Sequence, residues 1–73
     1  MAITAKQFKQ AVDENLQQGL AKTDPREALN YWWCLAGIRD LVTAPDGDSL
    51  YRYVTNAMVQ LDEYADALRK KAA

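Results

Sequence analysis

Two short proline-containing segments, at residues 23–25 and 44–47, interrupt a 73-residue chain that otherwise has the hydrophobic spacing of helices. In the first segment Asp24 can cap a helix that begins at Pro25, because the missing N–H of proline would be unpaired in the first turn anyway. In the second segment proline and glycine together favour a turn. No stretch shows the alternation of apolar and polar residues that indicates a strand. We therefore expect an all-α fold with one domain over residues 1–73, a small antiparallel three-helix bundle with helices at about 4–20, 25–43 and 48–71.

The first and third helices have further signals of their own. Thr4 and Gln7 have the spacing of a capping box, in which each side chain pairs with a free backbone N–H of the other residue. Gly19 is a candidate for a left-handed residue that ends the first helix, or the helix frays toward Lys22. The third helix is expected to be the longest, and its apolar residues step by four and three in a heptad pattern: Leu50, Val54, Ala57, Leu61, Tyr64 and Leu68.

The second helix has more apolar surface than one core can cover. Tyr31, Trp32 and Trp33 are consecutive, so at about 100° per residue they span about 200° of the helix surface. With Leu35 on the core face, Trp33 lies nearly opposite the centre of that face. The three rings therefore cannot all enter the same core.

Two interpretations of this helix are open. In the first, it is the middle element, the other two helices cover two of its sides, and both tryptophans are partly buried within one chain. In the second, an outward patch forms around a tryptophan next to a glycine, which has no side chain to keep another backbone away. This patch would serve either self-association or a different protein partner. Because a chain of this length has a small core, self-association as a homodimer is favoured. The candidate partner-binding residues are Leu29, Trp33, Ala36 and Gly37.

The composition argues against catalysis, metal binding and cofactors. The chain has no histidine, which removes the commonest general base and the commonest metal ligand. Its single cysteine, Cys34, lies mid-helix without a basic neighbour, so we expect a buried and unreactive thiol in a reducing compartment, the cytoplasm. Asp62 and Asp66 are one turn apart on a polar side, where carboxylates stay solvated. We expect a protein that is not an enzyme and binds no cofactor or metal.

The net charge of −1 weakens the case for binding to phosphate backbones. The longest apolar run, residues 31–38, is also too short to cross a bilayer, so no membrane partner is expected. We expect a small non-enzymatic protein–protein interaction module that acts through the aromatic helical face as a homodimer. It would be an accessory, adaptor or inhibitor protein of a kind typical of bacteria and phages. The alternative is a nucleic-acid-associated regulator that uses the basic C-terminal end of the third helix, Arg69, Lys70 and Lys71, together with Arg52.

Overall fold

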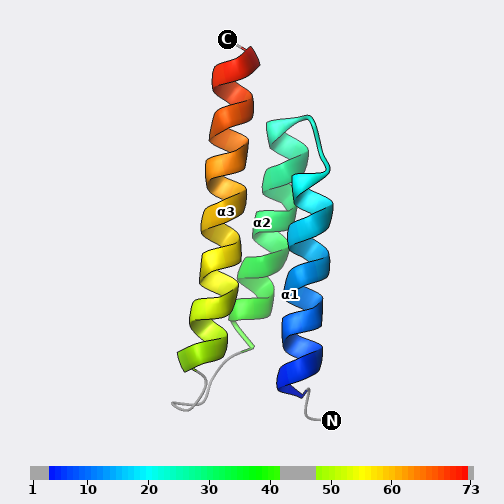
Figure 1. Ribbon diagram of the computed structural model, residues 1–73, viewed down its shortest axis with the longest axis vertical. Helices are drawn as coiled ribbons and strands as arrows, with labels where there is room; N and C mark the ends of the chain where they lie inside the picture. The colour runs from blue at the N-terminus through cyan, green and yellow to red at the C-terminus, as the bar shows by residue number, and fades with distance from the viewer. Residues whose placement is uncertain (1–3, 42–47, 73) are drawn as a thin grey trace.

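The computed structural model describes residues 4–41 and 48–72 and shows three α-helices (Figure 1). They are α1 (Ala5–Leu20), α2 (Pro25–Arg39) and α3 (Asp48–Ala72). Successive helices run in opposite directions, and each helix contacts both of the others. The expected all-α three-helix bundle is therefore confirmed, and α3 is the longest helix with 25 residues.

The first two helices begin where their capping residues predict. The Gln7 backbone N–H donates to Thr4 Oγ1 at 3.1 Å, and the Thr4 N–H donates to Gln7 Oε1 at 3.0 Å, so the capping box of α1 is complete. At the start of α2 the Arg26 N–H donates to Asp24 Oδ1 at 2.9 Å, and Pro25 occupies the first helical position. At the N-terminal ends of both α1 and α2, side chains therefore pair with backbone N–H groups that an uncapped helix leaves without an acceptor.

The second helix ends earlier than its sequence pattern predicts. It was expected to continue to about residue 43, but its last residue is Arg39, and Leu41 lies beyond it with 63% of its surface exposed. The Leu41 N–H donates to the Ile38 carbonyl at 3.0 Å, which is the tighter three-residue spacing that commonly closes a helix. Residues 42 and 43 lie outside the described residues.

Gly19 has a different role from the one its position near the end of α1 suggests. The helix continues through it to Leu20, and the capping residue Ala21 has right-handed helical angles. No described residue has a positive φ. A Cβ atom on Gly19 would lie 2.5 Å from Leu61 Cδ2 and 3.1 Å from Tyr31 Cβ. Gly19 is therefore a point of close approach between α1 and both other helices, and not a left-handed helix end.

The core lies along the line where the three helices meet. The heptad positions Val54, Ala57 and Leu61 of α3 are buried, and they pack against Leu35 of α2. From α1 the core receives Phe8 and Val12, together with Met58 of α3. The outer heptad positions are half-buried. Among the described residues no helix combines the length and apolar character that a membrane-spanning segment needs.

Candidate functional site

The three consecutive rings of α2 point in three directions. Tyr31 is half-buried on the side of α1, where Lys22 Nζ lies 5.8 Å from the centre of its ring. Trp32 is half-buried and packs against the core. Trp33 is 69% exposed. The sequence argument that one ring of the trio must leave the core is therefore correct, and that ring is Trp33.

The exposed indole is held in place by its neighbour. The ring centres of Trp32 and Trp33 are 4.8 Å apart and the ring planes are 84° from parallel. This edge-to-face arrangement is a favourable geometry for two aromatic rings. Because Trp32 is packed against the core, it gives the outer indole a fixed support at the surface.

The interpretation in which both tryptophans are partly buried is wrong for Trp33. Buried Ala28 and Leu35 mark the side of α2 that faces the other two helices. At about 100° per residue, Trp33 lies about 160° from Leu35 around the helix. Both neighbouring helices pack on the same half of α2, so its opposite half is uncovered.

The predicted patch is only partly an exposed surface. Gly37 is exposed, and nothing lies within 4 Å of where its Cβ atom would be, so the space beside it is open. Leu29 is half-buried, and Ala36 is half-buried against the core. The fold thus places Trp33 and Gly37 together on the outer side, with Leu29 and Ala36 at its edge.

Two charged residues close this surface at its ends. Arg26 lies seven positions before Trp33 and Asp40 seven positions after it, and both side chains are exposed. Seven residues are about 20° short of two full turns, so the three side chains project from nearly the same side. We call the following set the outward face of α2: Arg26, Leu29, Asn30, Trp33, Ala36, Gly37 and Asp40.

The expectation of a buried thiol is wrong, because Cys34 is exposed. It directly precedes the buried Leu35, and one residue turns a helix by about 100°, which is enough to bring a side chain out of the core. Cys34 lies with Glu27, Asn30 and Tyr31 of α2, and with Lys22 of the turn before α2, in a surface depression.

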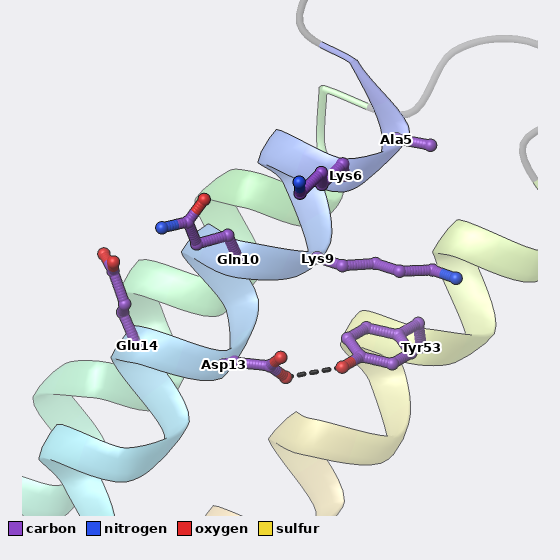
Figure 2. Close-up of a pocket in the computed structure, with 7 residues that line it drawn as sticks. All are labelled: Ala5, Lys6, Lys9, Gln10, Asp13, Glu14 and Tyr53. Atoms are coloured by element: carbon purple, nitrogen blue, oxygen red, sulfur yellow. Dashed lines mark hydrogen bonds between the residues drawn. The ribbon is translucent and has the colours of Figure 1, made fainter.

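A second surface feature joins α1 and α3 (Figure 2). The Tyr53 hydroxyl donates to Asp13 Oδ1 at 2.5 Å, and Lys9 Nζ lies 5.5 Å from the centre of the tyrosine ring. The hydrogen bond to Asp13, with smaller contributions from desolvation and from the carboxylate charge, raises the pKa of Tyr53. The neutral hydroxyl is thereby stabilised, so this group holds two helices together and does not act as a base.

The sequence analysis did not anticipate this contact. The two residues are 40 positions apart, and no local pattern links them. Tyr64 is a similar case, since its hydroxyl donates to the backbone carbonyl of Lys22 at 2.5 Å. In both cases a tyrosine of α3 reaches a polar group of α1 or of the turn after it.

Other groups considered for chemistry are dispersed. Within residues 4–41 and 48–72, no three Cys, Asp or Glu side chains are gathered in a way that could hold a metal ion. Asp62, Glu63 and Asp66 are all exposed, and Asp66 forms an ion pair with Lys70 at 3.3 Å. Arg69 and Lys71 are exposed near the C-terminal end of α3.

Comparison of the chain with protein-family models, with curated proteins and with solved structures finds no match in any of the three. The functional argument therefore depends on the geometry of the surface alone.

Proposed function

We propose that this protein is a small, non-enzymatic protein–protein interaction module that docks through the outward face of α2, with Trp33 as its anchor. The proposal places it among accessory, adaptor or inhibitor proteins, with a homodimer as the first complex to test. A chain with a single cysteine suits a reducing compartment, and the proposal places the protein in the cytoplasm.

The exposure of Trp33 is the observation that carries this proposal. Tryptophan is among the residues most enriched at the energetic centres of protein interfaces, where it fills a pocket and loses its water. The ring is supported by Trp32 and has open space beside it at Gly37. A rigid aromatic side chain loses little conformational freedom on binding, which favours its use as an anchor.

The nucleic-acid alternative receives no comparable support. Three basic residues lie in the last turn of α3, but cations at this position also interact favourably with the negative end of the helix dipole. One of them, Lys70, is already paired with Asp66. A salt titration separates the two functions, because a phosphate-binding protein loses affinity for duplex DNA steeply as salt rises.

The proposal is tested with Trp33→Ala and with Val59→Ala as a matched control. Val59 is 48% exposed on α3 and lies outside the outward face, so its truncation also removes exposed apolar surface. Sedimentation over a range of concentrations reports self-association. Wild type and both variants are also used as baits to capture binding proteins. Each captured protein is then purified, and its affinity for wild type and for both variants is measured.

We expect association to be lost with Trp33→Ala and retained with Val59→Ala. If Trp33→Ala preserves both the oligomeric state and the affinity for every purified partner, the proposed docking surface is wrong.

A further inference from the structure

We propose that two copies of this protein associate through α2 in an antiparallel pair, with the two-fold axis passing beside Trp33. This inference rests on the proposed function and adds the identity of the partner, the orientation and the register. It follows from the order of charge, size and open space along the outward face.

The charges at the ends of the outward face are arranged for an antiparallel copy. In a two-fold pair centred on Trp33, each residue lies opposite the residue of the second copy that is on the same flank of α2 and about equally far beyond the centre. Arg26 then lies opposite Asp40 of the second copy, and the same contact forms twice. No ion pair within the described part of the chain engages either side chain. In a parallel pair Arg26 would instead lie beside Arg26 of the second copy and Asp40 beside Asp40 of the second copy, and these like charges would repel.

Between Arg26 and Asp40, the sizes of the other side chains on the outward face fit the same register. Leu29 lies opposite Ala36 of the second copy on one flank, and Asn30 lies opposite Gly37 of the second copy on the other. Each larger side chain thus meets a smaller one, which is the pattern that lets two helices interdigitate. The open space at Gly37 is consistent with this arrangement, because nothing in its own chain occupies it.

The two indoles at the centre need not collide. Long side chains on a helix lean toward the N-terminus of their own helix. In an antiparallel pair the two N-termini point in opposite directions, so the two Trp33 rings lean away from each other. Each ring then passes toward the Ala36 and Gly37 side of the second copy, where the side chains are small.

The contact is small, so the dimer is weak. The 15 residues of α2 extend about 22 Å, and an interface along one short helix falls at the low end of the range for specific complexes. We expect a dissociation constant on the order of a micromolar or weaker. Measurements must therefore extend from about 1 µM to about 1 mM protein.

The register is tested by charge reversal at the two ends of α2, with the variants Arg26→Asp and Asp40→Arg. Each variant alone places like charges opposite one another twice. When the two are mixed in equal amounts, both contacts between the different chains become attractive. Both substitutions also favour the helix, because an acidic residue suits its first turn and a basic residue its last. The fold is checked by circular dichroism.

At low salt we expect each variant alone to dimerise about tenfold more weakly than wild type. The equal mixture should recover wild-type affinity as a heterodimer, as should the double variant Arg26→Asp/Asp40→Arg on its own. These differences should shrink as salt rises, since exposed ion pairs are screened. The single reversals are decisive for the orientation, because in a parallel pair like charges already face each other in wild type and each reversal leaves that repulsion unchanged.

The outcomes separate this inference from the proposed function. If wild type dimerises through Trp33 but the single reversals have no effect, the register is wrong and the docking surface stands. If wild type remains monomeric to about 1 mM while another purified protein binds in a Trp33-dependent way, the self-pairing is wrong and the interaction module stands. If dimerisation is unaffected by Trp33→Ala, both are wrong.

Discussion

At the scale of single residues, the two interior glycines of the described helices have opposite surroundings. A Cβ atom on Gly19 would contact Leu61 and Tyr31, whereas one on Gly37 would contact nothing within 4 Å. Leu61 is fully buried, so its side chain would have to shift within the core to make room. Close packing of α1 against both other helices therefore depends on the absence of a side chain at residue 19.

We expect Gly19→Ala to lower the free energy of unfolding by about 1–3 kcal/mol, as is typical of overpacking in a core. The control Gly37→Ala should raise it by about 0.5–1 kcal/mol, because alanine favours a helix where there is room for it. Urea denaturation of dilute samples measures both. Equal effects at the two positions would contradict the close approach at Gly19.

A second prediction at this scale concerns Tyr53 and Asp13. The hydrogen bond to Asp13 raises the pKa of Tyr53 in the folded protein. A raised folded-state pKa means that the stabilisation is complete below the unfolded value of about 10 and is lost as pH rises through the folded value. The contact should therefore fail only in alkaline solution.

In an ultraviolet titration of phenolate formation, we expect one tyrosine of Asp13→Ala to ionise at lower pH than in wild type. Tyr53→Phe should show a smaller loss of stability above about pH 10 than wild type does. In each experiment only the difference between the variant and wild type is assigned to this contact. Identical titration curves for wild type and Asp13→Ala would show that the bond does not persist in solution.

At the scale of the elements, helix starts were predictable and some helix ends were not. The starts of α1 and α2 depend on side chains that pair with backbone N–H groups two or three residues away, so the signal is local. The end of α1 at Leu20 matches the expected position, but Gly19 just before it is a contact with α2 and α3 and not a left-handed end. The end of α2 at Arg39 comes about four residues before the position that its hydrophobic spacing indicated.

We expect Asp24→Ala to lower the free energy of unfolding by about 1 kcal/mol, because the Arg26 N–H loses its acceptor. The matched control is Asp24→Asn, which retains a side-chain oxygen and should change stability little. Thermal and urea unfolding measure both variants. A loss with asparagine as large as with alanine would mean that charge, and not the hydrogen bond, stabilises this end of α2.

At the scale of the whole molecule, the bundle is long and thin, with extents of 44 × 18 × 14 Å. The C-terminal end of α3 extends past the other helices (Figure 1). A chain of this size buries a small core, so its stability is marginal. Any complex that covers Trp33 would add to that stability by mass action.

We therefore expect the melting temperature of wild type to rise with protein concentration and that of Trp33→Ala to stay constant. At a free concentration about tenfold above Kd, the stabilisation is about 1.4 kcal/mol, which corresponds to several degrees for a domain of this size. Differential scanning calorimetry at several concentrations measures this, with Val59→Ala as the control. A constant melting temperature for wild type across the range would contradict self-association.

The sequence by itself determined the helical class, the starts of the first two helices, the buried heptad positions of α3 and the fact that one ring of the aromatic trio must leave the core. These properties depend on spacing along a single helix or on caps of a few residues, and such information is local. Only the tertiary structure decided that no second helix covers Trp33, that Cys34 is exposed, that Gly19 is a contact between helices and that Tyr53 reaches Asp13. Each of these depends on which sides of a helix its two neighbours cover, and that is settled by packing among residues far apart in the chain.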